Sequence, residues 1–369
     1  MPRRAAQRIR LISCSATITD SRTVVFIDAG HYIGKSGRNG TADSGHASAY
    51  HGRPRSEVMT LSAQFVLLEQ EALLHITGPD TLKFLQGQTT CDAAAVTAAQ
   101  AVVGAYCTPK GRMVCDFLLG QLGEEHYALR LRRSVADVAA STFGKYIVFS
   151  KADIAPERSD WQVVGIWGES SAQALSELGI DVPGGRYQST AGEGWLLVQL
   201  DDEGHYLEAW IDMQEHSAQY DRLRQALQAG DANAWNGAQI RAGIGRVEDT
   251  TSEMFLPQDL NYDVTSHVNF SKGCYTGQEI VARLHYRGKA KRRAYPTVAA
   301  TTEQPAAGVA LYAAGKSQSV GTVVNSGRDG DQVLCLVSAT REGLEQGLRV
   351  GSEDGPLLEA LPLPYALED

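Results

Sequence analysis

From Leu61 onward, the pattern of apolar and polar positions alternates between that of strands and that of short helices. Short apolar runs at 65–68 and 73–76 have the length and bounding residues of strands. The segment 77–87 then predicts a short helix, because Thr77 can cap it, a proline lies in its first turn and a glycine ends it. The chain therefore begins its ordered part with two strands followed by a helix.

Two further apolar runs, at 101–106 and 113–119, flank the sequence Thr108-Pro109-Lys110-Gly111. Proline and glycine stand where a β-turn favours them, so the pair predicts a hairpin with Lys110 at its tip. A helix is expected from about residue 134 to 143, followed by a strand at 146–150.

A similar order of strands and helices recurs after residue 160. Hairpins within each run indicate an α+β fold rather than a parallel sheet with crossover helices. The expected elements of this second run are strands at 162–167, 195–200 and 206–211 and helices at 170–178 and 215–229.

The pattern of apolar and polar residues changes after about Arg293. Short apolar runs at 308–312, 320–324 and 333–337 are separated by Gly, Ser, Asp and Asn. This pattern is typical of a small all-β domain and predicts a barrel.

These changes divide the chain into four parts. Residues 1–58 lack sustained periodicity and are expected to be a disordered tail, or a leader that precedes a natural start at Met59. Residues 59–155 and 156–292 are expected to form two α+β subdomains, and residues 293–369 the β-barrel domain.

Charge is unevenly distributed along the 369 residues. The net charge is −9, but residues 1–58 carry nine Lys/Arg and four Asp/Glu, so the remainder is strongly acidic. An acidic body is not typical of a general nucleic-acid binder. No apolar stretch is long enough for a membrane helix or a signal-peptide core, so we expect a cytoplasmic protein without membrane contact.

The cysteines do not form a recognisable metal or disulfide pattern. None lie in a C-x-x-C pair, and their density is too low for a disulfide scaffold. We expect most of them to be buried, including the three that fall between residues 91 and 115, and we expect no resident metal site. The six are Cys14, Cys91, Cys107, Cys115, Cys274 and Cys335.

One cysteine lies in a chemically suggestive segment, "NFSKGCYTGQEIVAR". Thr276 to Glu279 has the form of a helix capping box, which would place Cys274 just before a helix N-terminus. Lys272 lies two residues before it, and in an extended segment its charge would stabilise a thiolate by on the order of 2 kcal/mol. We therefore expect Cys274 to be a reactive thiol and Lys272 to stabilise its anion. The alternative is a structural cysteine packed under the helix.

At this segment the sequence resembles the YgfZ family and its mitochondrial relatives in iron–sulfur cluster maturation. The family's hallmark, K-G-C-[FY]-x-G-Q-E, is matched by Lys272 through Glu279. The likeness extends from about Phe65 to the C-terminus and includes "ITGPDTLKFLQGQTTCD", "YCTPKGRM" and "YRGKAKRR".

The resemblance implies a fold similar to the aminomethyltransferase of glycine cleavage, with subdomains in a ring around a folate-binding opening and a C-terminal β-barrel. It implies a cofactor, tetrahydrofolate or a related folate, and a transient iron–sulfur cluster. Family members support iron–sulfur enzymes, including those that thiomethylate tRNA. Expected partners are therefore folate and iron–sulfur maturation proteins or client enzymes, without direct contact with tRNA.

The resemblance also implies candidate folate contacts. Two tryptophans bind folate in the family; one aligns with Trp235, whereas Glu71 stands at the position of the other. A tryptophan could stack on a pterin, whereas a glutamate could only hydrogen-bond the ring nitrogens. Packing in a core is the other interpretation of Trp235.

A basic run follows the cysteine segment, with no acidic residue from Arg283 to Arg293. Arg287 in this run is a candidate contact for the folate glutamate tail, for tRNA phosphate or for an acidic partner. The other interpretation is a solvated linker.

The second function hypothesis is a tetrahydrofolate-dependent one-carbon transferase. It would use Asp116, since aminomethyltransferases carry a functional acidic residue near this part of the fold. Hydrogen bonding within a strand is the alternative role of Asp116. The accessory, non-enzymatic role is the preferred hypothesis.

Overall fold

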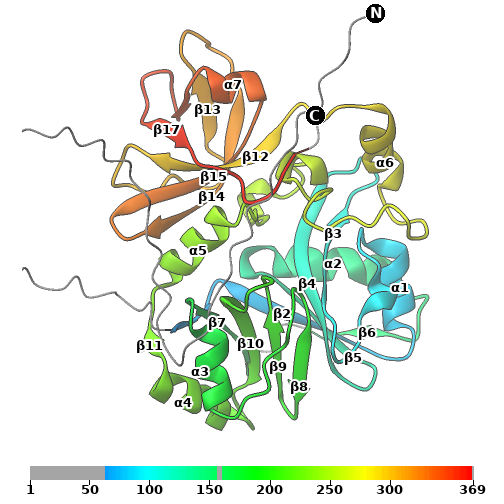
Figure 1. Cartoon of the computed structure of the whole chain (residues 1–369). Helices are drawn as coiled ribbons and strands as arrows, with labels where there is room; N and C mark the ends of the chain where they lie inside the picture. The colour runs from blue at the N-terminus through cyan, green and yellow to red at the C-terminus, as the bar shows by residue number, and fades with distance from the viewer. Residues whose placement is uncertain (1–62, 156–159, 368–369) are drawn as a thin grey trace, which may run out of the picture. The chain divides into compact units, whose positions relative to one another are not determined.

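Two sheets pack against each other in the computed structural model of the chain, which describes residues 63–155 and 160–367 (Figure 1). The first sheet is antiparallel with strand order β3-β4-β5-β2-β6, and the second has the order β11-β1-β7-β10-β9-β8. The first is built from β2 (Glu71–Thr77), β3 (Val102–Cys107), β4 (Met113–Gly123), β5 (His126–Arg132) and β6 (Asp153–Ile154). The second is built from β1 (Gln64–Leu67), β7 (Trp161–Trp167), β8 (Ser189–Gly192), β9 (Trp195–Gln199), β10 (Tyr206–Asp212) and β11 (Gln228–Ala229).

The core lies in three layers because each sheet is apolar on both faces. Leu118 of the first sheet and Trp210 of the second belong to one buried cluster between the sheets. The outer face of the first sheet is covered by α1 (Thr81–Gln88) and α2 (Ala136–Ile147), and that of the second by α3 (Ser171–Glu177) and α4 (Ser217–Ala226). Gly120 lets the two sheets approach, since a Cβ there would lie 2.6 Å from Leu196.

Strand β1 belongs to the second sheet, although the chain continues from it directly into the first sheet. It precedes β2 of the first sheet, yet it pairs with β7 and with β11 in the second. The second sheet is therefore completed by a strand from the N-terminal end of the described chain.

A closed six-stranded barrel follows, with strand order β12-β15-β14-β13-β16-β17. Helix α5 (Ala232–Arg241) packs closely on it: a Cβ at Gly237 would lie 2.0 Å from the Arg328 carbonyl oxygen of β14. The barrel elements are β12 (Arg293–Ala299), β13 (Ala310–Ala313), β14 (Gly321–Asp329), β15 (Gln332–Ala339), α7 (Arg341–Glu345), β16 (Leu348–Val350) and β17 (Leu357–Ala360). Helix α6 (Gln278–Arg287) precedes it.

The predicted fold class is confirmed. The structure combines mixed helices and antiparallel hairpins with a C-terminal barrel, and the hairpin around Thr108–Gly111 forms with the Gly111 amide donating to the Thr108 carbonyl. The cysteines at 91, 107 and 115 are buried, as expected for free cysteines.

Several local predictions are wrong. Of the expected strand at 146–150, the first two residues are the end of α2, which continues through Gly144 to Ile147, and the others form a turn. Thr77 does not cap α1; the cap position is Asp80, whose side chain instead accepts from the Lys151 amide. Strand β5 and helix α5 were not predicted.

Two statements concern the limits of the described chain. The tail or leader expected at residues 1–58 lies outside the described residues. Within the described residues, none of the helices combines the length and apolar character needed to cross a membrane.

Candidate functional site

The cysteine segment forms an exposed turn before α6. Cys274 is exposed, and Gly277 is the residue that precedes the helix, with a left-handed φ of 84°. The predicted capping box is therefore wrong: the helix begins at Gln278, and the Thr276 hydroxyl donates to the Gln88 side chain instead. Glycine is required at 277 because a Cβ would lie 2.4 Å from the Thr108 carbonyl oxygen.

The Lys272 ammonium binds the end of α1 and not the Cys274 thiol, whose anion it was predicted to stabilise. It donates to the carbonyl oxygens of Gln86 and Thr89 at the C-terminal end of α1, the second at 2.8 Å. In the parts of the chain that the structure describes, no hydrogen bond or ion pair joins Lys272 to Cys274. The segment is not extended, since the Asn269 side chain accepts from the amides of Ser271 and Lys272 and closes a turn. Lys272 therefore anchors the turn to α1.

Burial lowers the pKa of Lys272, because half of the side chain has left water. Its ammonium also lies 5.3 Å from the centre of the Tyr275 ring, a cation–π contact. Two carbonyl dipoles and one ring thus hold the partly desolvated charge of Lys272.

A second polar region, here called the Glu71 cluster, is fully buried. The Glu71 carboxylate accepts from Arg246 through both guanidinium Nη atoms at 3.1 Å and from Arg132 Nη1 at 2.9 Å, and Arg130 Nη1 lies 3.6 Å away. Three acidic and three basic side chains therefore meet inside the protein. The cluster consists of Glu71, Asp116, Arg130, Arg132, Glu208 and Arg246.

The other acids bind the outer edges of these guanidinium groups. Asp116 of β4 accepts from Arg246 Nε and from the Val247 amide, and Glu208 of β10 accepts from Arg130 Nε at 2.8 Å. Each charge has an opposite partner, which is the condition under which buried charges are tolerated.

Burial opposes the charge on both Glu71 and Asp116, yet neighbouring charges outweigh it. The arginines around Glu71 hold the pKa of its carboxyl below the ordinary value. Arg246 and the Val247 amide do the same for the pKa of Asp116. Both carboxyls are therefore ionised at neutral pH, and neither is available as a proton donor.

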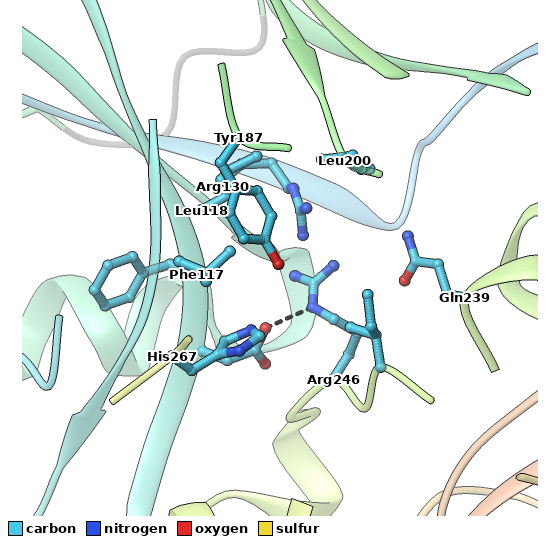
Figure 2. A pocket seen from close by; sticks show the side chains of 11 residues that line it. Phe117, Leu118, Arg130, Tyr187, Leu200, Gln239, Arg246 and His267 are labelled. Carbon is cyan, nitrogen blue, oxygen red and sulfur yellow. Dashed lines mark hydrogen bonds and ion pairs between the residues drawn. The ribbon is translucent and has the colours of Figure 1, made fainter. Parts of the chain in front are cut away.

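The cluster borders a cavity of about 40 Å³, here called the Arg246 cavity (Figure 2), because Asp116, Arg130 and Arg246 belong to its lining. It is closed on one side by apolar side chains of β4 and on the other by α5 and the segment that follows. Tyr187 reaches into it from a backbone with φ of 61°, an uncommon conformation for a bulky residue. The lining residues are Val103, Asp116, Phe117, Leu118, Arg130, Tyr187, Leu200, Gln239, Ile244, Arg246 and His267.

One lining atom has no partner. Gln239 Oε1 is buried and accepts no hydrogen bond from the described residues. A buried acceptor in this state costs free energy unless a ligand or water donates to it. Space of about 40 Å³ admits a few water molecules at most, because one water needs roughly 10–15 Å³ measured in this way.

His267 forms the floor of the Arg246 cavity. Its ring stacks on Tyr262 at 3.9 Å between ring centres, and Nδ1 lies 3.0 Å from Thr265 Oγ1. Burial lowers the pKa of His267 to about 4, so the ring is neutral at physiological pH.

The predicted folate contacts do not converge on this cavity. Trp235 is fully buried between the sheets, edge-on to Trp167 and Tyr206, and is not among the lining residues. Both Glu71 oxygens are occupied by guanidinium groups. Arg287 is the exposed last residue of α6, within the basic run, and does not line the cavity.

The arginines of the cluster were missed by sequence analysis. A usable signal exists in "HYALRLR": Arg130 and Arg132 are two residues apart in an apolar strand, so both face the same side. Glu208 within "YLEAWID" is a similar case. Charged residues on the buried face of a strand indicate partners of opposite charge elsewhere in the fold.

No group of three or more His, Cys, Asp or Glu side chains able to hold a metal ion occurs among residues 63–155 and 160–367.

Comparisons with known proteins show clear relatives. Residues 41–186 match the family model described as the GCVT N-terminal domain. The tRNA-modifying protein YgfZ of Yersinia pseudotuberculosis is 32% identical over 329 residues, which cover 87% of this chain and 99% of that protein. YgfZ of Pectobacterium atrosepticum is 31% identical over 84% of this chain and 93% of that protein.

A solved structure shows the same fold. The glycine cleavage system aminomethyltransferase T of Bartonella henselae superimposes with a TM-score of 0.67, covering 83% of this chain and 87% of that chain at 15% identity. The predicted aminomethyltransferase-like fold is confirmed.

Glu71→Gln should lower the free energy of unfolding by about 3 kcal/mol, because it leaves buried guanidinium charge uncompensated. Urea unfolding at neutral pH measures the change. The lowered pKa of Glu71 stabilises the protein above the unfolded-state pKa near 4.5 and ceases to do so as the pH falls through the folded-state value. The difference between wild type and variant should therefore shrink in acid. Glu69→Gln at the exposed neighbour is the control; an equal loss in both variants would contradict the cluster's role.

His267→Phe should flatten the pH dependence of stability between pH 6.5 and 4. In this window the histidine is neutral in the folded state but protonated in the unfolded state. The free energy of unfolding of the wild type therefore decreases by up to about 3 kcal/mol as the pH is lowered from 6.5 to 4. Phenylalanine keeps a ring against Tyr262 but cannot titrate. Urea unfolding at a series of pH values measures both slopes, with His285→Gln on the exposed face of α6 as control. Parallel slopes in wild type and His267→Phe would refute the assignment.

Proposed function

The chain belongs to the YgfZ family, and from that premise we propose that it is a folate-binding accessory protein of iron–sulfur cluster assembly. In this role it supports tRNA modification by thiomethylation indirectly, through iron–sulfur enzymes that depend on it. The relatives' name as tRNA-modifying proteins and the aminomethyltransferase-like fold support the proposal.

The observation that carries the proposal is the exposure of one thiol. Of the cysteines that the structure describes, Cys274 alone is exposed. Burial raises the pKa of Cys91 to about 11 and that of Cys107 and Cys335 to about 12, which keeps those thiols protonated. Among the described cysteines, a partner protein or cluster can therefore meet a thiol only at Cys274.

Cys274 acts as a sulfur ligand for iron on a cluster that a partner presents, giving up its proton to solvent on binding. Lys272 is a positioning residue in this scheme, because its ammonium ties the turn to α1 rather than to the sulfur. The basic run that includes Arg287 lies on and after the helix that begins four residues beyond Cys274. It suits an acidic partner that docks beside the thiol better than a folate in the interior.

Folate binds at the Arg246 cavity in this proposal. The unpartnered Gln239 Oε1 suits the N–H groups of a pterin, and apolar side chains such as Leu200 and Ile244 suit its ring faces. The cavity must widen on binding, since its volume of about 40 Å³ is far below that of a ligand pocket. Glu71 acts only through the arginines, and Trp235 through packing of α5 beneath Gln239.

A tetrahydrofolate-dependent transferase is the second candidate, because Asp116 lines this cavity. Both of its carboxylate oxygens already accept hydrogen bonds, from Arg246 and Val247, which argues against a free catalytic base. One-carbon turnover that is lost in Asp116→Asn and retained in Cys274→Ala would favour this candidate.

Cys274→Ala should reduce thiomethylated nucleosides in cellular tRNA to the level of a strain that lacks the protein. Cys274→Ser should do the same, because a hydroxyl is a poor ligand for cluster iron. Mass spectrometry of tRNA nucleosides measures the effect. Both variants should keep their unfolding free energy within about 0.5 kcal/mol, since the side chain is exposed. Ser271→Ala in the same turn is the control; normal tRNA in the Cys274 variants would sink the thiol mechanism.

Gln239→Leu should weaken binding of a reduced folate about tenfold, because it replaces the unpartnered acceptor with an apolar group of similar size. Calorimetric titration with tetrahydrofolate and 5-formyltetrahydrofolate measures the affinities. Gln173→Leu on the exposed face of α3 is the matched control. Unchanged affinity in Gln239→Leu would place the folate site elsewhere.

A further inference from the structure

Helix α6 and the segment that follows it carry positive charges without partners. Four basic side chains there are exposed, and none of them forms a hydrogen bond or an ion pair within the described part of the chain. Two other members of the basic run are not counted. Arg293 pairs with Asp263 at 2.6 Å, and Arg292 is half-buried beside Asp259. The four free cations are Arg283, Arg287, Lys289 and Lys291.

Two of these cations flank a tyrosine on the outward face of α6. The buried residue of the helix is Val281, so the helix packs on the protein by that side. Arg283 lies two positions further, close to the opposite side. Tyr286 and Arg287 follow Arg283 by three and four positions, which makes the three side chains neighbours. Glu279 is the single acidic residue between 278 and 292, and it offsets one of the four positive charges at most.

The Tyr286 ring presents one face to solvent. The residue is 66% exposed. The ring of His285 stacks on that of Phe270 at 3.8 Å between centres, and the centre of the Tyr286 ring lies 4.7 Å from the first and 6.0 Å from the second. These distances form a nearly right-angled triangle with its corner at His285, so the tyrosine stands beside the edge of that ring. One tyrosine face contacts this edge, and the other has no ring against it among the described residues.

An aromatic face next to cations matches the two parts of a nucleotide. Every base has a π face that stacks on an aromatic ring with little regard to sequence, and every phosphate carries negative charge. A base stacked on Tyr286 would bring its neighbouring phosphates toward Arg283 and Arg287. In a duplex the bases are already stacked on one another, so only an unpaired strand can offer a base in this way.

An acidic protein fits this face less well. The centre of a protein interface is apolar, with several side chains buried together. On α6, Tyr286 stands largely alone, because Ile280 lies against the turn at Gly111 and is only 37% exposed. The acidic composition beyond residue 58 argues against a general nucleic-acid binder, since it repels a long polyanion, but it permits a short segment at a local basic face.

We propose that the outward face of α6 binds a short single-stranded nucleic acid, with a base on Tyr286 and phosphates on Arg283, Arg287 and the lysines that follow. RNA and DNA share this chemistry. The proposal goes beyond the proposed function and does not depend on Cys274 or on folate at the Arg246 cavity, so either can fail without the other.

Fluorescence anisotropy of the full chain with labelled oligomers tests the proposal. Adenosine octamers of RNA and of DNA carry bases and phosphates, an abasic octamer carries the phosphates alone, and an oligoglutamate of equal charge represents an acidic protein. We expect at least one adenosine octamer to bind, and the abasic octamer and the oligoglutamate to bind at least about tenfold more weakly. Tighter binding of the RNA octamer indicates RNA, tighter binding of the DNA octamer indicates DNA, and equal binding indicates a site that does not read the sugar.

Tyr286→Ala should weaken binding of the adenosine octamer about tenfold and leave the abasic octamer unaffected, because it removes stacking alone. Tyr286→Phe keeps the ring and should bind as the wild type does. Arg283→Gln should weaken binding of both octamers and reduce the salt dependence of the affinity, because one phosphate contact is lost. Arg224→Gln removes an exposed arginine of α4 and is the matched control. Circular dichroism verifies that each variant is folded.

Residues 1–58 carry net positive charge and attract any polyanion, so the proposal requires more than binding. It is overturned if neither adenosine octamer binds at about 100 μM protein, or if the abasic octamer or the oligoglutamate binds equally well. It is also overturned if a folded Tyr286→Ala variant binds the adenosine octamer with wild-type affinity. Because the comparison of adenosine and abasic octamers needs no variant, failure of a variant to fold leaves the test intact.

Discussion

A buried carboxylate among three guanidinium groups is the constraint on which this structure depends. Glu71 comes from the first sheet, Arg246 from the segment that leads from α5 toward the barrel, and Glu208, through Arg130, from the second sheet. Three acids and three arginines balance each other, and every one of them is almost completely buried. Since an unpaired charge in this environment costs several kcal/mol, the parts of the protein that supply these groups have one arrangement in which all charges are satisfied. The cluster therefore specifies how the sheets and the barrel segment fit together.

The same cluster separates the interior chemistry from the thiol. Two cavities border it, one lined by Arg246 and the other by Arg132, and each contains a buried polar atom without a partner. Cys274 lies apart from both, on an exposed turn that Lys272 ties to the end of α1. A ligand in the interior and a protein at the surface can thus be bound independently, and α1, which rests on the first sheet, is the physical link between them.

Sequence patterns predicted the fold well where local signals were strong. The hairpin around Lys110 and three of the barrel strands, β13, β14 and β15, follow from alternation and turn residues, which act over a few positions. Helix α5 was not predicted because Asn, Gly and Gln interrupt its apolar face, and its packing against the second sheet and the barrel stabilises it. Cys274 is exposed. The direction of the Lys272 side chain depends on the Asn269 turn and on α1, which is distant in sequence. Long-range pairing of charges, as at Glu71 and Arg246, leaves almost no local trace.

The placement of β1 has a consequence for biosynthesis. Both of its partners, β7 and β11, are made roughly 100 or more residues later, so this strand has no neighbour when it leaves the ribosome. Contacts that close such long loops form late and slow the acquisition of the native topology. The strands of the first sheet all lie between Glu71 and Ile154, so this sheet can form while β1 is still unpaired. Pairing of β1 is therefore expected to be a late step in the formation of the second sheet.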